Sequence, residues 1–264
     1  MVSKSDEYYT HRRLILSSIL PNFSLTCSLS SPMYEQSDHA VELDYPFEQR
    51  HRPVRIVGSC NGLVCFGNDQ EDYMFLWNLS TRKVKRLQDP GVGFVYDSSR
   101  VCGFGYDKSN DDYKVVTSRC VFGDGGALEK TELMVQSLRT NSWRRIAGCP
   151  LIIALGRTGK FVSGSLHWLA FTMNRSKVIV SVDLAYETGG EVVQPSYGDG
   201  PFALTLEVLS GWLCVLCDFY GYRTDVWVMK EYGMRESWTK LFTIIPYLTN
   251  PMSFFSLHTT CHFK

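Results

Sequence analysis

Short apolar runs alternate with polar turns along the chain, and one arrangement of the two recurs. Residues 226–241 read VWVMKEYGMRESWTKL: a run rich in β-branched and aromatic residues, a polar turn, and a second run that opens on tryptophan. LWNLSTRKVKRL (76–87) and VQSLRTNSWRRI (135–146) share this layout, and SVDLAYETGGEV (181–192) is a weaker copy. Such runs, separated by Gly, Asn, Asp and Ser, are typical of strands and turns. The pattern predicts a repeated β unit and little helix.

The spacing of the copies predicts what the unit is. The position that opens the last strand falls at Val84, at Trp143, near Gly190 and at Trp238, so the intervals are 59, about 47 and about 48 residues. A Gly-rich insertion at 122–130 accounts for the longer first interval. Four antiparallel strands repeated about every 45 to 50 residues are typical of a β-propeller blade. Stacking such sheets buries both faces of each one.

We therefore predict an all-β fold, a β-propeller-like array of about four four-stranded antiparallel blades. The alternative is an ordinary β-sandwich with coincidental spacing. The predicted strands, unit by unit, are 54–59, 63–68, 73–80 and 84–88; 100–107, 112–121, 132–138 and 142–146; 160–164, 165–171, 177–184 and 191–195; and 204–211, 212–218, 224–231 and 237–244.

Further strand-like pieces flank the four units. Two precede them, at 23–32 and 40–47, and one follows at 253–260. We therefore expect the array to be incomplete or to be closed by the N-terminal strands. By domain, we expect residues 1–50 to form an N-terminal segment with flanking strands and residues 51–264 to form the propeller-like domain.

Trp and Gly occupy repeated positions in the units. Trp143 and Trp238 open a fourth strand, where a large ring can wedge between blades while its N–H reaches a loop carbonyl. Gly62, Gly164 and Gly211 lie between the first and second strands, where a tight hairpin favours positive φ. We predict structural roles for all five residues.

Composition excludes several classes of function. Lys plus Arg and Asp plus Glu both number 27, so the chain has no net charge to draw it to nucleic acid or an anionic membrane. The N-terminal apolar run, Leu14–Leu20, contains two serines and makes a poor signal peptide. The nine cysteines are expected to be reduced thiols, which predicts a cytoplasmic or nuclear protein.

No motif in the chain indicates catalysis. Cys214 and Cys217 form a C-x-x-C, but residues three apart on a strand face opposite ways and cannot share a metal without a bulge. The acidic segment Asp107–Asp112 lacks the glycine and glutamate of a calcium loop, so we interpret it as a hairpin turn. His167 lies on a predicted strand, and we expect its side chain to pack against neighbouring residues or to lie at the edge of the sheet. The basic run 82–86 is expected to be a solvated edge. We expect no catalytic residue, no metal and no cofactor.

Five motifs in order resemble the plant F-box-associated, kelch-related domain over roughly residues 11–245. They are RRLILSS (12–18), VRIVGSCNGLVCF (54–66), LWNLSTRKVKRL (76–87), GFGYDKSNDDYKVV (103–116) and VSGSLHWLA (162–170). The resemblance implies a non-catalytic substrate receptor. In that family an N-terminal F-box docks on the Skp adaptor of a cullin-based ubiquitin ligase, and the β domain captures the protein to be ubiquitinated.

The resemblance also sets the expected partners. Only 11 residues precede RRLILSS, and they have no pattern of a helical bundle. The F-box is expected to be missing, so Skp adaptor and cullin would be partners only of a longer form. The partner of this chain is expected to be a protein substrate, without nucleic acid or membrane. The alternative is a kelch-type propeller enzyme or a carbohydrate-binding protein, which would need a convergent set of His, Tyr or Cys ligands.

The predicted meander places its loops on two rims. Turns between strands one and two and between strands three and four share the tight-turn rim; the remaining loops and the connections between units form the long-loop rim. Long loops on a rigid scaffold are the usual place for recognition, and Tyr and Arg are favoured anchors. We expect substrate contacts on the long-loop rim, above all from FYGYR (219–223). The candidate residues are Phe94, Tyr96, Arg157, Arg175, Tyr197, Phe219, Tyr220, Tyr222 and Arg223.

Overall fold

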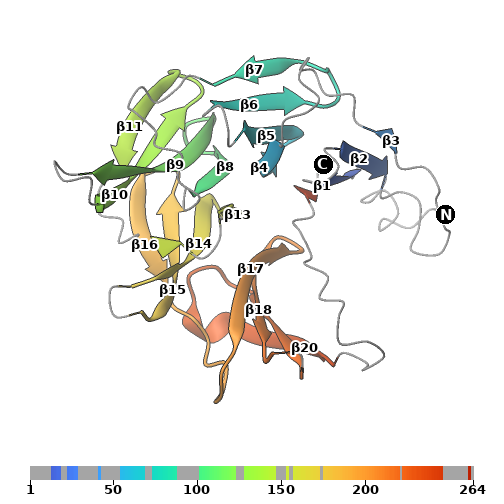
Figure 1. Ribbon diagram of the computed structural model, residues 1–264, viewed down its shortest axis with the longest axis vertical. Coiled ribbons are helices and arrows are strands. Elements are labelled where there is room, and N and C mark those ends of the chain that lie inside the picture. The colour runs from blue at the N-terminus through green and yellow to red at the C-terminus, as the bar shows by residue number, and fades with distance from the viewer. Residues whose placement is uncertain are drawn as a thin grey trace. The chain divides into compact units, whose positions relative to one another are not determined.

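The computed structural model describes twelve stretches of the chain, which consist of strands, their turns and one short 3-10 helix, η1 (Arg235–Ser237) (Figure 1). Phe94, Tyr96 and the predicted strand at 253–260 lie outside these stretches. The described residues are 13–18, 23–28, 41–42, 54–68, 73–87, 101–122, 128–146, 153–154, 157–172, 175–220, 222–245 and 261–262.

The described strands form five antiparallel sheets, which we name A to E: β21-β1-β2-β3, then β4 to β7, β8 to β11, β12 to β16, and β17 to β20. Their bounds are β1 Arg13–Ser18, β2 Phe23–Ser28, β3 Val41–Glu42, β4 Val54–Cys60, β5 Leu63–Asn68, β6 Tyr73–Asn78, β7 Val84–Arg86, β8 Cys102–Asp107, β9 Asp112–Phe122, β10 Leu128–Ser137, β11 Ser142–Ile146, β12 Ile153–Ala154, β13 Lys160–Val162, β14 Ser165–Phe171, β15 Lys177–Asp183, β16 Thr188–Val192, β17 Ala203–Leu209, β18 Trp212–Asp218, β19 Thr224–Met229, β20 Trp238–Ile244 and β21 Cys261–His262.

Sheets B to E confirm the four predicted units. Each is a meander whose consecutive strands pair antiparallel, and all sixteen predicted strands are present. Sheet D has a fifth strand that the sequence did not indicate. β13 pairs with the N-terminal half of β14, and the additional strand, β12, pairs with the C-terminal end of β14.

Sheet A is built from both ends of the chain. The predicted N-terminal pieces contain β2 and β3, and RRLILSS supplies β1. The remaining strand, β21, comes from the C-terminal region and pairs with β1 through Leu14↔His262 and Ile15↔Cys261. RRLILSS and the two N-terminal strand-like pieces therefore contribute to a fifth sheet, which two residues of the C-terminal region complete.

The chain divides into two compact units. One comprises residues 1–96 with 257–264 and contains sheets A and B; the other comprises residues 97–256 and contains sheets C, D and E. The domain boundary expected at residue 50 falls inside the first unit and stays a prediction. In that unit, Phe66 and Phe75 stack across sheet B with ring centroids 5.1 Å apart, and Trp77 is buried.

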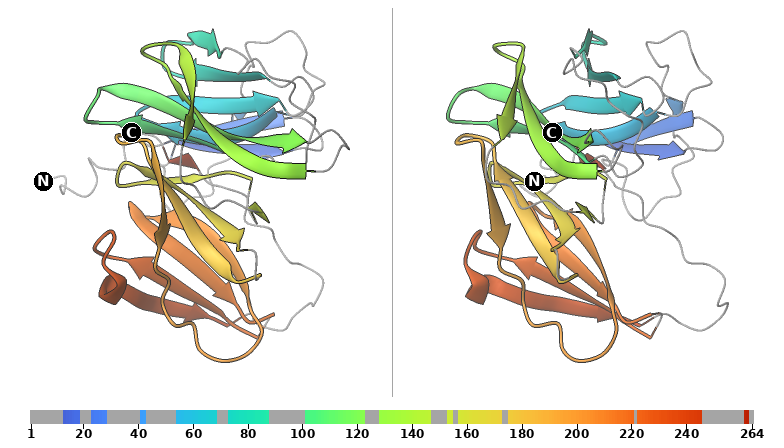
Figure 2. Two further views of the ribbon diagram at one scale, coloured as in Figure 1. Left: turned by 90° about the vertical axis from the view of Figure 1, so that its left-hand side faces the viewer. Right: turned by 60° about the vertical axis from the view of Figure 1, so that its left-hand side comes forward.

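In the second unit, sheet D lies between sheets C and E (Figure 2). Neighbouring residues of β14 point to opposite faces, so Trp168 joins a buried cluster with sheet C and Leu169 joins one with sheet E. Because both faces are covered, β14 is apolar at consecutive positions instead of alternate ones. This stacking is the arrangement that the sequence repeat predicted.

The β4–β5 turn of sheet B, the β13–β14 turn of sheet D and the β17–β18 turn of sheet E are two-residue hairpins. Gly62, Gly164 and Gly211 have φ of 79°, 80° and 86°, which confirms the predicted positive values. The residue before each glycine also has positive φ, which is the geometry of a type I′ turn. The loops that these hairpins place on the tight-turn rim are therefore short.

Candidate functional site

The turn between β18 and β19 carries the best of the predicted contact residues. It is closed by two backbone hydrogen bonds, from the Phe219 amide to the Arg223 carbonyl at 2.9 Å and from the Tyr222 amide to the Phe219 carbonyl at 3.2 Å. Tyr220 occupies the left-handed region, with φ 48°. The backbone of the turn is thereby held by the ends of two paired strands.

The side chains of this turn divide into a supported base and an exposed surface. Phe219 is half-buried against Phe202, and the Arg223 guanidinium lies 4.3 Å from the centroid of the Phe219 ring. Tyr220 and Tyr222 are 61% and 84% exposed. Tyr220, Tyr222 and Arg223 are therefore exposed beside Phe219, which packs against Phe202. We call Phe219–Arg223 the aromatic turn.

Tyr197, another of the predicted contacts, is buried. Its side chain is only 9% exposed and packs against Phe202 and Trp227, and its hydroxyl donates to the Gln194 amide oxygen at 3.1 Å. Burial raises the pKa of the Tyr197 phenol. A loop tyrosine can turn inward when its loop crosses the edge of a core, so Tyr197 belongs to the packing between sheets D and E.

The other predicted residues are placed separately. Arg175 is exposed in the β14–β15 turn, with φ 63°. Arg157 is exposed beside sheet C, where its carbonyl accepts a hydrogen bond from the Cys102 amide at 2.8 Å. Phe94 and Tyr96 lie outside the described residues. Among the described residues, the predicted contacts that lie together are those of the aromatic turn.

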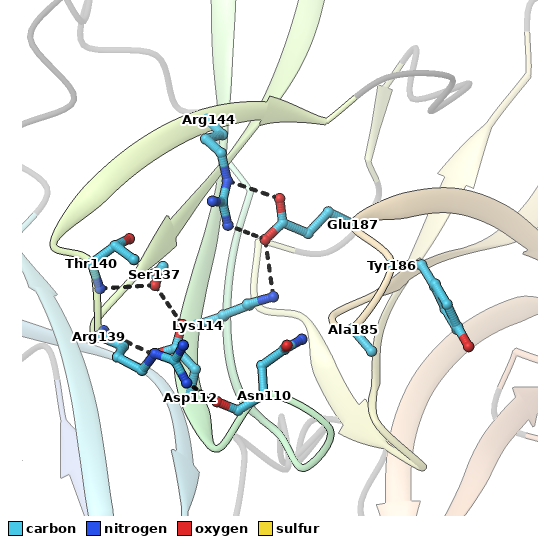
Figure 3. Close-up of a pocket in the computed structure, with 10 residues that line it drawn as sticks. All are labelled: Asn110, Asp112, Lys114, Ser137, Arg139, Thr140, Arg144, Ala185, Tyr186 and Glu187. Atoms are coloured by element: carbon cyan, nitrogen blue, oxygen red, sulfur yellow. Dashed lines mark hydrogen bonds and ion pairs between the residues drawn. The ribbon is translucent and has the colours of Figure 1, made fainter.

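A polar pocket on the opposite, tight-turn rim was not anticipated from the sequence (Figure 3). It has a volume of about 420 Å³ and lies where the β8–β9 and β10–β11 turns of sheet C meet the β15–β16 turn of sheet D. We call it the rim pocket. Its walls are turn residues and the first residues of the adjoining strands, and its lining includes Asn110, Asp112, Lys114, Arg139, Arg144 and Glu187.

Lys114 forms the floor of the rim pocket. Its side chain is 3% exposed, and its Nζ lies 2.9 Å from an oxygen of Asp107 and 2.9 Å from an oxygen of Glu187. It also donates to the Leu184 carbonyl. Because Asp107 is on sheet C and Glu187 on sheet D, one ammonium group connects two sheets, with its three donors satisfied.

The charges of this floor stabilise one another. Burial by itself would raise the pKa of both carboxyls, but hydrogen bonds from Asn110 and Lys114 lower that of Asp107, and hydrogen bonds from Arg144 and Lys114 lower that of Glu187. Burial would lower the pKa of Lys114, but hydrogen bonds to Asp107 and Glu187 raise it. All three groups are therefore charged at neutral pH.

The acidic segment Asp107–Asp112 is a hairpin turn, as the sequence indicated. Asp107 accepts hydrogen bonds from the backbone amides of Ser109 and Asn110. Asp112 accepts one from the Ser137 hydroxyl and one from the Arg139 amide, at 2.5 and 2.9 Å. These carboxylates hold two neighbouring turns in place.

The remaining chemical candidates are core residues. Cys214 and Cys217 lie in different buried clusters, which confirms that they face opposite sides of β18. His167 is fully buried and makes two contacts, its Nδ1 3.0 Å from the Lys160 carbonyl and its Nε2 2.7 Å from the Tyr232 hydroxyl. Desolvation lowers its pKa to about 4.

Two features are absent from the residues that the structure describes. Nowhere in them do three or more His, Cys, Asp and Glu side chains gather as they would around a metal ion. Nor does that part of the chain include a helix with the length and apolar character needed to cross a membrane.

Stacked four-stranded meanders are the organisation of β-propeller blades, and comparison with protein families agrees. The sequence model of the F-box associated beta propeller domain matches residues 13–262. The chain belongs to this family, which decides against the alternative of a β-sandwich.

Its relatives include F-box proteins of Arabidopsis thaliana. An F-box/kelch-repeat protein is 36% identical over 201 residues, covering 74% of this chain and 54% of the relative. F-box protein CPR1 is 33% identical over 237 residues, covering 78% of this chain and 56% of the relative. The chain therefore spans about half the length of these proteins. Among solved structures, TolB from Acinetobacter baumannii matches with a TM-score of 0.47 and 10% identity, over 84% of this chain and 61% of TolB.

Proposed function

We propose that this chain is the substrate-recognition module of an SCF-type cullin ubiquitin ligase, and that it binds a protein and catalyses no reaction. Its membership in the F-box-associated family supports this role. In a longer form that carries an F-box, the Skp adaptor and the cullin would be further partners. The nine cysteines fit work in the cytoplasm or nucleus, where thiols stay reduced.

The aromatic turn is the proposed centre of substrate contact. The observation that supports it is the exposure of Tyr220 and Tyr222 above the stacked pair of Phe219 and Arg223. Tyr and Arg are enriched among the residues that dominate binding energy, because they offer large area or forked donors at modest entropic cost. Arg157 and Arg175 are proposed as further contacts, and Phe94 and Tyr96 stay predicted contacts.

The test compares the proteins captured by the wild-type chain with those captured by a Tyr220→Ala, Tyr222→Ala double variant. Plant-cell extracts treated with a proteasome inhibitor supply the candidates, and each is then purified and its Kd measured. The double variant is expected to bind the authentic substrate at least tenfold more weakly than wild type and to keep the wild-type melting temperature.

A matched control is Met234→Ala. Met234 is 53% exposed in the turn between β19 and β20, at the opposite end of sheet E. This variant is expected to retain wild-type affinity. Unchanged affinity in the double variant, with loss in Arg82→Ala or Arg139→Ala on the tight-turn rim, would refute the assignment of the surface. Saturable binding of an oligosaccharide at the aromatic turn would favour the carbohydrate-binding alternative.

A further inference from the structure

The rim pocket has an uneven supply of hydrogen-bonding groups. Every carboxylate oxygen in it or beneath it already accepts at least one hydrogen bond or ion pair. Asp107 is bonded to the 109–110 backbone, Asn110 and Lys114; Asp112 to Ser137 and Arg139; and Glu187 to Lys114 and Arg144.

The two guanidinium groups are less fully used. Arg139 spends one N–H on the Asn110 carbonyl at 2.8 Å, and it forms no ion pair with a carboxylate of the described residues. Arg144 uses Nε and one terminal nitrogen on Glu187, while its side chain remains 50% exposed. A guanidinium has five N–H donors, so both residues keep donors that face solvent at the pocket.

The carboxylates and the arginines of the pocket also differ in how far they are buried. Asp107 and Asp112 are 1% and 5% exposed, whereas the arginines lie at the surface. The two aspartates are thus enclosed, Glu187 is 20% exposed and paired with Lys114 and Arg144, and the most accessible charged groups are the two arginines. A ligand that fits this surface supplies acceptor oxygens and negative charge.

The charge balance indicates how much negative charge fits. The network contains three cations, Lys114, Arg139 and Arg144, and three carboxylates, Asp107, Asp112 and Glu187, so it is neutral before any ligand binds. Because a neutral network has no surplus positive charge, each negative charge of a ligand adds to the cost of binding, so a monoanionic carboxylate suits it better than a dianionic phosphoryl group.

A neighbouring side chain points to a protein as the source of that carboxylate. Tyr186 is 81% exposed and lies at the edge of the pocket on the β15–β16 turn, with its ring directed outward (Figure 3). An exposed tyrosine offers apolar area next to a charged subsite, which suits a peptide segment with apolar residues beside its acid.

We propose that the rim pocket binds an Asp or Glu side chain of a protein partner, with Arg139 and Arg144 as donors to the carboxylate. This is a second interaction surface on the tight-turn rim. It does not depend on the aromatic turn, and it applies whether or not the chain acts in a ligase.

The test is a titration of the ¹⁵N-labelled 264-residue chain with three synthetic pentapeptides, each followed through the arginine Nε–H and the Thr140 amide resonances. The probes are acetyl-Ala-Leu-Glu-Leu-Ala-amide, its Gln analogue and its phosphoserine analogue. The Glu peptide is expected to shift these resonances saturably, and the Gln peptide is expected to bind at least tenfold more weakly.

Two variants locate the binding. Arg139→Gln is expected to lower the affinity for the Glu peptide at least fivefold. Because Arg139 is at the surface, the spectrum of this variant should otherwise remain that of the folded protein. Arg145→Gln is the matched control, since Arg145 is exposed on β11 beside Arg144 but pairs with Glu132 outside the pocket. This control is expected to bind like wild type.

Three outcomes would overturn the proposal: no saturable shift, equal binding of the Glu and Gln peptides, or equal loss from the Arg139 and Arg145 variants. Tighter binding of the phosphoserine peptide would also overturn it, in favour of a dianionic ligand. None of these results bears on capture of a substrate by the aromatic turn, so the two proposals fail separately.

Discussion

At the scale of single residues, Trp238 shows how one side chain joins two sheets. It opens β20 in sheet E, is 8% exposed, and belongs to the buried cluster shared with sheet D. Its ring N–H donates to the Val193 carbonyl, just beyond the end of β16, at 2.8 Å. This confirms the predicted wedge with its hydrogen bond to a loop. Trp143 is half-buried at the corresponding position, and its role as a wedge stays a prediction.

Replacing Trp238 with Ala is expected to lower the free energy of unfolding by about 3–5 kcal/mol, because a buried ring and its hydrogen bond are lost together. Trp212→Ala is the matched control, since Trp212 is 38% exposed in the hairpin of the same sheet, and it is expected to cost less than about 1.5 kcal/mol. Urea denaturation measures both. Equal losses would show that Trp238 does not join the sheets.

At the scale of strands, the approach of sheets C and D depends on glycines of β8. A Cβ at Gly105 would lie 2.4 Å from the Phe161 ring and 2.8 Å from Leu184, and one at Gly103 would lie 2.9 Å from the Trp168 ring. The G-F-G of β8 therefore provides space for bulky side chains of sheet D. Both glycines are therefore explained by packing.

Gly105→Ala is expected to destabilise the protein by about 1–3 kcal/mol, because a ring and a leucine must shift to admit one methyl group. Gly190→Ala in β16 is the control. The nearest atom to its added Cβ would be the Ser181 hydroxyl at 3.2 Å, which can rotate away. Thermal melting of the two variants compares them, and a neutral Gly105→Ala would contradict the close packing.

At the scale of the whole molecule, buried ionisable groups tie stability to pH. The pKa of His167 is about 4 in the folded protein against 6.5 when exposed, so the unfolded chain binds a proton more readily. Stability from this residue is complete above pH 6.5 and is lost as the pH falls toward 4. The difference in pKa corresponds to about 3 kcal/mol.

Asp107 and Glu187 act in the same direction at lower pH. Their folded pKa values are lowered, so their contribution is present above the pKa of exposed carboxyls, about 4, and is lost as the pH falls through the folded values. Lys114 has a raised pKa, and its contribution is lost only as the pH rises through that value.

The pH profile of the unfolding free energy checks the role of His167. Wild type is expected to lose about 3 kcal/mol more than His167→Gln between pH 6.5 and 4, because Gln cannot take up the proton. Both proteins should lose stability alike below pH 4, where the carboxyls titrate. Parallel profiles across the upper window would mean that His167 is not held neutral by burial.

The sequence by itself determined the sheets. Hairpin strands are adjacent in the chain, and side chains alternate along each one, so apolar runs and turn residues were enough to place sixteen of the seventeen strands of sheets B to E. The Gly62, Gly164 and Gly211 hairpins followed from the same local chemistry. The opposite faces of Cys214 and Cys217 followed from strand geometry alone.

Only the tertiary structure decided what lies between sheets. The pairing of β1 with β21 joins residues from opposite ends of the chain. β12 has only two residues, which is too short for a recognisable strand pattern in the sequence. Lys114 and Glu187 are 73 positions apart in the sequence, and nothing local indicates that a strand lysine meets a turn glutamate. Tyr197 turned inward for the same reason: whether a loop side chain is buried depends on which neighbour covers it. Periodicity reports the environment along one strand, whereas contacts between sheets arise from folding of the whole chain.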